Sequence, residues 1–183
     1  CGNMTYNATD IPNLSEVKSM SGMFYSATSF NADLDEWDVS NVTDMSQLFY
    51  NANAFNGAIG SWDVSNVTDM SEMFFAANIF NQDIGNWDVG NVKTLEGMLG
   101  FTPFNQYIGN WNVSSVENMR GVFGMAANFN QNIGAWDVSN VTDMSAMFSG
   151  ATSFNQNIGG WIVSNVTEMG YMFFNAKSFN QDI

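Results

Sequence analysis

The sequence predicts an α/β repeat solenoid of seven coils, with short parallel strands on one face and short helices on the other. Two observations predict this class: a unit of about 25 residues recurs almost verbatim, and each unit contains two hydrophobic periods. Self-similarity at such a period is typical of solenoids, whose units bury their apolar residues only when stacked. The tryptophans that mark the repeat, at spacings of 25, 25, 24, 25 and 25 residues, are Trp37, Trp62, Trp87, Trp111, Trp136 and Trp161.

The repeat divides the chain into a lead-in, residues 1–11, and a single repeat domain, residues 12–183. Pro12 occupies the tryptophan position of the first copy. One copy is a residue shorter, and its deletion falls beside Pro103 in the segment LGFTPFNQYIG, which we expect to be a loop. The predicted coils are 12–36, 37–61, 62–86, 87–110, 111–135, 136–160 and 161–183.

The start of each copy is predicted to be a short strand. In the segment WDVS, the apolar Trp62 and Val64 alternate with the polar Asp63 and Ser65. Alternation with period two places the apolar pair on one side of an extended chain. We expect these segments to pair in parallel from coil to coil.

The middle of each copy is predicted to be a helix of two to three turns. Apolar residues follow the spacing i, i+3, i+4 and i+7, which places them on one helix face. Thr68 is the expected N-cap, and Asp69 after it suits the positive end of the helix dipole. In the third copy the apolar face consists of Met70, Met73, Phe74 and Ala77.

Stacked copies align their apolar residues into columns, which we interpret as a hydrophobic core and not as a cofactor site. Beside a column of valines and one of methionines runs a column of phenylalanines. Burying a large apolar side chain contributes roughly 1.5–3 kcal/mol. The phenylalanine column is Phe30, Phe55, Phe80, Phe104, Phe129, Phe154 and Phe179.

One polar residue, an asparagine directly after that phenylalanine, is present in every copy. A primary amide both donates and accepts hydrogen bonds, so stacked asparagines can satisfy backbone groups of adjacent coils. We interpret the row as a buried structural ladder and expect the neighbouring Gln82 to be exposed and dispensable. The ladder is Asn31, Asn56, Asn81, Asn105, Asn130, Asn155 and Asn180.

The segment VTDMSEMFFAANIFNQDI, residues 67–84, resembles the core of the BspA-like leucine-rich repeats of bacterial surface proteins. The recurring pattern NQxIGxWDVSNVTDMS, as in residues 130–145, is also similar to the 26-residue repeat of bacterial lipoproteins and adhesins. The resemblance covers about residues 12–183. It implies a leucine-rich-repeat-like solenoid on a cell surface, with a role in binding or adhesion and no agreed catalytic residues.

The composition excludes several classes of function. The chain has a formal net charge of −14 and only four basic residues, so the basic clusters that bind nucleic acid or an anionic membrane are missing. No apolar run approaches the roughly 18 residues that a transmembrane helix needs. The absence of histidine and the single cysteine argue against imidazole catalysis, a zinc site and intrachain disulfides.

We expect no enzyme, because the residues that interrupt the repeat form no catalytic set. Cys1 is followed by glycine, as in a mature bacterial lipoprotein whose first cysteine bears the lipid. The alternative is that this cysteine is merely where the given chain starts. The expected localisation is extracellular or on the cell surface, with lipid attachment through Cys1.

A row of exposed carboxylates is the predicted binding face. Carboxylates on strands about 4.8 Å apart repel one another, so either a cation or basic partner neutralises them or each caps its own turn. Calcium is the only cofactor that the row would suit, and no defined metal motif is present. The face comprises Asp38, Ser40, Asp63, Ser65, Asp88, Asn112, Ser114, Asp137, Ser139 and Ser164.

Together these observations predict a non-enzymatic module that presents a repetitive acidic face to a surface protein or a glycan. A self-assembling structural protein, built by stacking solenoids through their exposed ends, is the alternative. Recognition of ice or a mineral surface is a third, which the charged aspartates disfavour.

Overall fold

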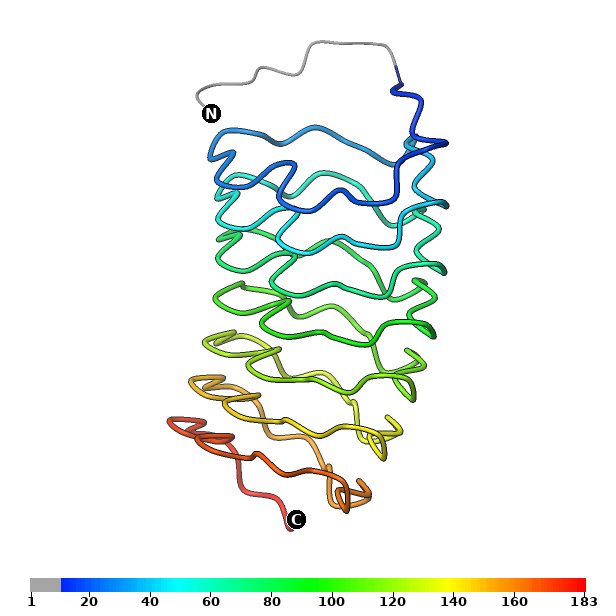
Figure 1. The fold of residues 1–183 in the computed structure, drawn as a ribbon. Helices are drawn as coiled ribbons and strands as arrows, with labels where there is room; N and C mark the ends of the chain where they lie inside the picture. The colour runs from blue at the N-terminus through cyan, green and yellow to red at the C-terminus, as the bar shows by residue number, and fades with distance from the viewer. Residues whose placement is uncertain (1–10) are drawn as a thin grey trace.

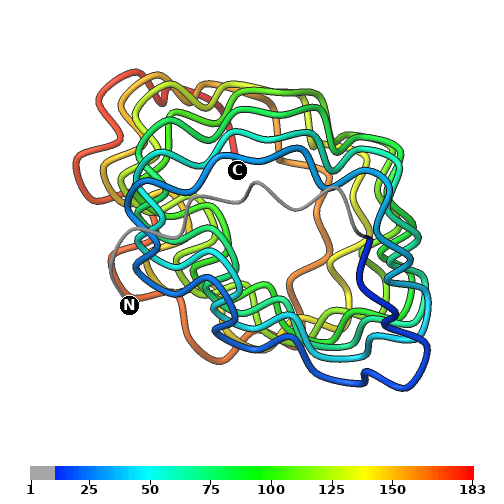
Figure 2. The same cartoon turned by 90° about the horizontal axis from the view of Figure 1, so that it is seen from above.

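The computed structural model describes residues 11–183, which wind through seven successive coils that lie one beneath the other (Figure 1). Viewed along the stack, the coils superimpose as a rounded ring (Figure 2). Parallel bridges of single residues join each coil to the next. Their ladder runs through Ser19, Asp44, Asp69, Thr94, Asn118, Asp143 and Glu168.

The predicted α/β class is wrong. Residues 11–183 contain no helix and no extended strand, so the coils lack the helices and strands of a leucine-rich-repeat-like solenoid. Apart from the bridges, the coils consist of turns and irregular segments.

The segment expected to be helical is a chain of turns. Within residues 70–77, Met73 donates its N–H to the carbonyl of Met70, which closes a turn of four residues. The N–H of Phe74, in contrast, donates to the carbonyl of Met98 in the next coil, at 3.0 Å. This alternation continues along the segment, so no N–H is left for the i to i−4 bond of a helix.

Backbone conformation also rules out a helix in this segment. Glu72 and Ala76 have φ values of 54° and 56°, in the left-handed region that a right-handed helix never enters. Each complete coil has such a residue at the same two positions. The spacing of apolar residues nevertheless places the same side chains inside, since Met70 and Phe74 are fully buried.

Gly121 distinguishes the two conformations experimentally. Its φ is 61°, and a Cβ added there would meet nothing within 4 Å. Gly121→Ala should therefore destabilise the protein by about 1–2 kcal/mol through backbone strain alone, whereas in a helix it would stabilise by about 1 kcal/mol. Urea unfolding gives the sign. Gly170→Ala is the control, because that position is equally open and its φ lies outside the left-handed region.

The WDV segments have the predicted sidedness but are not strands. Trp62 and Val64 are buried and Asp63 is exposed, as the alternation indicates. Between residues 11 and 183, however, the backbone hydrogen bonds of these segments are local turns, such as the Trp62 N–H to the Ile59 carbonyl, and none pairs one WDV segment with another. Val64 instead accepts from the N–H of Val67 and closes a turn, at 2.9 Å. The expected N-cap Thr68 donates its hydroxyl to the Thr43 carbonyl of the preceding coil.

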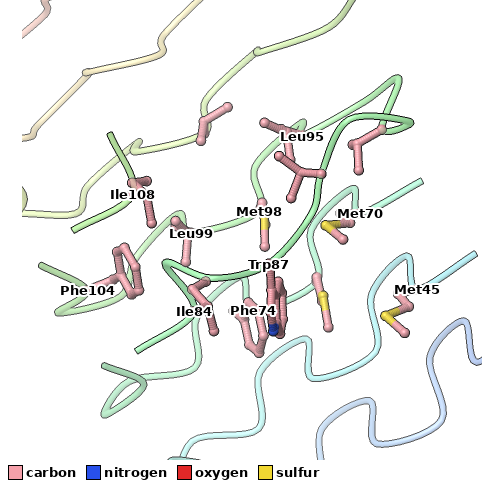
Figure 3. Packing of buried hydrophobic residues seen from close by; sticks show 14 of the residues in the cluster. Met45, Met70, Phe74, Ile84, Trp87, Leu95, Met98, Leu99, Phe104 and Ile108 are labelled. Carbon is pink, nitrogen blue, oxygen red and sulfur yellow. The ribbon is translucent and has the colours of Figure 1, made fainter. Parts of the chain in front are cut away.

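One continuous hydrophobic core runs through the interior of the stack, from Leu14 to Met172. Figure 3 shows the rings of Phe74 and Trp87 side by side, with Met70 and Leu99 in the same cluster. The two phenylalanine rings of a coil stack closely, as in the pair Phe74 and Phe80 with centroids 3.8 Å apart. The columns predicted from the repeat therefore form the core.

The shortened coil absorbs its missing residue at Thr102. In other coils a turn joins the alanine and the phenylalanine of the column, as where Phe55 donates its N–H to Ala52. In the short coil, the buried Thr102 hydroxyl donates to Leu99 O at 2.6 Å and accepts from the Phe104 N–H. The side chain thus replaces the backbone turn.

Candidate binding face

The aspartates of the predicted face are exposed, and each is fixed by its own turn. Asp38 Oδ1 accepts the backbone N–H of Ser40 at 3.1 Å and the Ser40 hydroxyl at 2.6 Å. This is an Asx turn, in which a side chain bonds to the backbone two residues on. The same turn recurs at Asp63, Asp88, Asn112 and Asp137. We call this row of five side chains the acidic face.

These hydrogen bonds lower the pKa of two carboxyl groups of the face, Asp38 and Asp137. The Ser40 hydroxyl, followed by the Ser40 N–H, holds the pKa of Asp38 below its ordinary value. Ser139 has the same effect on the pKa of Asp137. A lowered pKa means that the charged carboxylate favours the folded state above the ordinary pKa of about 3.9, and that this contribution is lost as the pH falls through the folded value.

The serines of the predicted face lie beside these turns. Ser65 and Ser114 donate their hydroxyls to Asp63 and Asn112, at 2.6 and 2.7 Å. Ser139 donates its N–H to Asp137. Ser164 lies in the last coil, where the exposed Ile162 stands in the aspartate position.

The Asx turns explain why a carboxylate recurs in successive coils, and they do so without a bound cation. In the part of the chain that is described, no cluster of three or more acidic, cysteine or histidine side chains is arranged to hold a metal ion. Calcium binding by the row stays an untested proposal.

Replacing Asp38, Asp63, Asp88 and Asp137 together with Asn tests that proposal. An amide oxygen caps the turn as well as a carboxylate, as Asn112 shows, so we expect each substitution to change stability by less than about 1 kcal/mol at neutral pH. Thermal melting with calcium and with chelator should give the same response in parent and variant. A calcium-dependent gain confined to the parent would instead establish cation bridging.

The asparagines after the core phenylalanine form a ladder between coils. Asn56 Oδ1 accepts the backbone N–H of Asn81 at 2.8 Å, and Asn81 Oδ1 accepts that of Asn105. The same bond begins at Asn31 and ends at Asn180. The ladder is half-buried to exposed and not fully buried, in contrast to the expectation.

The glutamine that follows this asparagine also joins the coils, so the expectation that Gln82 is exposed is wrong. Gln82 is half-buried, and its Nε2 donates to the Asn56 carbonyl at 2.5 Å. Gln106 and Gln131 repeat this contact in later coils.

Asn81→Ala should lower the free energy of unfolding by about 1–3 kcal/mol, because the Asn105 N–H loses its acceptor. Asn86→Ala is the matched control: Asn86 is exposed, and the coil of residues 111–135 already has alanine, Ala135, at that position. Urea unfolding of the two variants compares them directly. Equal stability would show that the ladder adds nothing measurable.

Two further ladders were missed by the sequence analysis. Asn66 Nδ2 donates to the Ser40 carbonyl of the preceding coil at 2.8 Å, and Asn91, Asn140 and Asn165 repeat the bond. The recurring asparagine of SNV is the signal that would have revealed it. Five tryptophans form the second ladder, since each of their indole N–H groups donates to a carbonyl 27 or 28 residues earlier, such as Ile59 O for Trp87. They are Trp62, Trp87, Trp111, Trp136 and Trp161.

A strip of aromatic side chains on the outside of the coils was also missed. Tyr25 stacks on Tyr50 with ring centroids 4.7 Å apart, and Tyr50 stacks on Phe75 at 5.1 Å. Phe101 continues the strip at 5.1 Å from Phe75 with a tilted ring. Burial, followed by the nearby charge of Glu72, raises the pKa of Tyr50.

Two expectations concern membranes. Cys1, the expected lipid attachment site, lies outside the described residues. No helix that could span a membrane occurs within residues 11–183.

Comparison with known proteins identifies a repeat family. The family model described as "Mycoplasma protein of unknown function, DUF285" matches residues 2–108 and again residues 99–183. Searches of curated proteins and of solved structures gave no match.

Proposed function

Because the chain belongs to the DUF285 repeat family, which is the BspA-like repeat family in general, we propose that it is a non-enzymatic binding module. The acidic face contacts the partner, a protein or a glycan. The module works outside the cell or on its surface, where a lipid on Cys1 would hold it, in keeping with the surface-protein repeats that its sequence resembles.

The fixed, exposed carboxylates of the acidic face are the observation that carries this proposal. Each Oδ1 is held by its own turn, as Ser65 holds Asp63. The hydrogen bonds of Asp38, Asp63, Asp88 and Asp137 to described residues use Oδ1, and all four residues are exposed. Side chains that are already immobilised lose little conformational entropy when a ligand binds.

Charge favours a cationic partner. The chain has a net charge of −14, and two of its four basic residues are engaged in ion pairs, Lys93 with Glu117 at 3.5 Å and Arg120 with Glu96 at 4.0 Å. A protein segment rich in lysine and arginine would be steered toward such a surface, with an association rate that falls as salt rises. Glycan hydroxyls would bind by hydrogen bonds to the same oxygens.

Binding to arrays of basic peptides and of glycans tests the proposal. The variant with Asn at Asp38, Asp63, Asp88 and Asp137 should lose binding by more than about tenfold. A control variant with Asp33→Asn, Glu72→Gln, Asp83→Asn and Asp182→Asn changes the net charge equally at residues outside the face and should keep binding. If both variants lost binding equally, the net charge of the protein and not the acidic face would explain the binding. If the parent protein bound neither array, the proposal would be refuted.

A further inference from the structure

The aromatic side chains on the outside of the coils rest on glycines of the next coil. A Cβ added to Gly100 would lie 2.9 Å from Cδ2 of Phe75, so that ring lies against bare backbone. Met125 occupies the position of Phe101 one coil further on, and its side chain lies on Gly150 in the same way. We call the row that runs along the stack from the first coil to the fifth the aromatic strip. It consists of Tyr25, Tyr50, Phe75, Phe101 and Met125.

Packing does not explain the most exposed part of the strip. Phe101 and Met125 are 48% and 50% exposed. Their φ values are 57° and 59°, in the left-handed region, which is a strained conformation for a large side chain. Asn51 and Gly150, at the same position in other coils, are residue types that adopt this conformation readily. Large apolar side chains that are both exposed and strained are typical of a functional surface.

The stacked rings of the strip cover one another's faces. Tyr50 lies between Tyr25 and Phe75, with interplanar angles of 1° and 13°, so both of its faces are occupied. Cations and sugar rings bind to the faces of aromatic side chains. The edges that remain are suited to contact with apolar side chains. The strip therefore fits a protein partner and not a glycan.

The spacing of the rings indicates the secondary structure of that partner. From coil to coil the ring centroids are 4.7, 5.1 and 5.1 Å apart. Successive turns of an α-helix are about 5.4 Å apart. Side chains on one face of a β-strand are about 6.6–6.8 Å apart, which is too far. A helix laid along the stack would place one apolar side chain per turn against each successive coil.

Charge favours a basic helix. The chain has a net charge of −14, and Glu72 lies beside the strip. A Cβ added to Gly97 would meet Cγ of Glu72 at 3.3 Å and Cδ2 of Phe75 at 3.4 Å. Burial, followed by the charge of Glu72, raises the pKa of Tyr50 in the same strip. Lysine or arginine on the flank of the helix would face Glu72, although an exposed ion pair adds little, so the apolar contacts supply most of the affinity.

We propose that the aromatic strip docks a basic amphipathic helix of a partner protein, laid along the stack axis. The apolar side chains of the helix cover Phe75, Phe101 and Met125, and its basic side chains face Glu72. This surface goes beyond the acidic face of the proposed function and does not depend on it. The acidic face presents fixed carboxylates, whereas the strip presents apolar rings.

Isothermal titration calorimetry with synthetic peptides of leucine and lysine tests the proposal. The probe has its leucines at i, i+3, i+4 and i+7, so that they form one helix face. One comparison peptide has the same composition in strict alternation, and the other has the helical spacing with glutamate in place of lysine. The parent protein should bind the probe at least about tenfold more tightly than either comparison peptide.

A double variant with Phe101→Asn and Met125→Asn should bind the probe more than about tenfold more weakly than the parent does. Asparagine suits the backbone there, because Asn51 and Asn175 have φ values of 54° and 58° at the same position. Thermal melting verifies that the double variant is folded.

The matched control is a double variant with Ile79→Asn and Tyr107→Asn. These side chains are 50% and 51% exposed and lie outside the strip, and other coils have Asn128 and Asn132 at their positions. The control should keep the affinity of the parent. Equal loss in the two double variants, equal binding of all three peptides, or no binding of the probe by the parent would overturn the proposal.

The variant with Asn at the four aspartates of the acidic face separates the two surfaces. If the probe bound only to the acidic face, that variant would lose it and the Phe101, Met125 double variant would keep it. This result would overturn docking on the strip and leave the proposed function intact.

Discussion

Phe74→Ala should lower the free energy of unfolding by about 3–5 kcal/mol, the usual cost of removing a buried phenylalanine. The Phe74 ring is fully buried and stacks on Phe80 at 3.8 Å, with Phe49 5.6 Å away in the preceding coil. Its removal would leave a cavity between stacked rings. Because each coil contacts only its neighbours, the damage should also weaken coupling between the two halves of the stack.

Urea unfolding measured by fluorescence and circular dichroism checks this expectation. Phe101→Ala is the control, because that ring is 48% exposed and its loss should cost less than about 1 kcal/mol. If the two variants were equally stable, the stacked phenylalanine column would not be the main source of cohesion.

Trp136→Ala should also cost about 3–5 kcal/mol, since the indole is buried and stacks on Trp111 at 6.4 Å. Trp136→Phe should cost less. The phenyl ring keeps most of the burial but loses the indole N–H that donates to the Ile108 carbonyl at 3.1 Å, a bond of about 0.5–1.5 kcal/mol.

Equilibrium unfolding of both variants separates the two contributions. Trp161→Phe is the matched control, because Trp161 lies in the last coil, is only half-buried and makes the longer bond of 3.3 Å to Ile133 O. A Phe variant as unstable as the Ala variant at position 136 would show that the hydrogen bond outweighs burial.

The period, the buried columns and the polar ladder could be predicted from the sequence, because each follows from stacking identical units. The conformation of the buried segment could not. Met70, Met73 and Phe74 have helical spacing, but a chain of turns buries the same residues. What decides between them is the carbonyl of Met98 and its neighbours, which lie 24 residues further along the chain. Local periodicity contains no information about such a partner.

The position of the acidic face could be predicted from the sequence, but the identity of its ligand could not. The alternation in WDVS correctly places Asp63 outside and Trp62 inside. The same aspartate was open to two explanations, a bound cation or a capped turn, and the short bond from Ser65 shows the capped turn. Because the repeat already accounts for each carboxylate locally, recurrence alone does not identify a partner.

The N–H groups of the turn segments that point toward the next coil give the stack a net dipole along its axis. In the turn segment of each of the first six coils four peptide groups donate toward the next coil, and at most two backbone N–H groups just before that segment donate to a carbonyl of the preceding coil, as Thr68 does to Thr43 O. Peptide dipoles of about 3.5 D that align head to tail add up, as they do along a helix. The molecule should therefore have a macrodipole along its axis, positive at the last coil and negative at the first. In an external field, molecules would orient with the stack axis along the field lines.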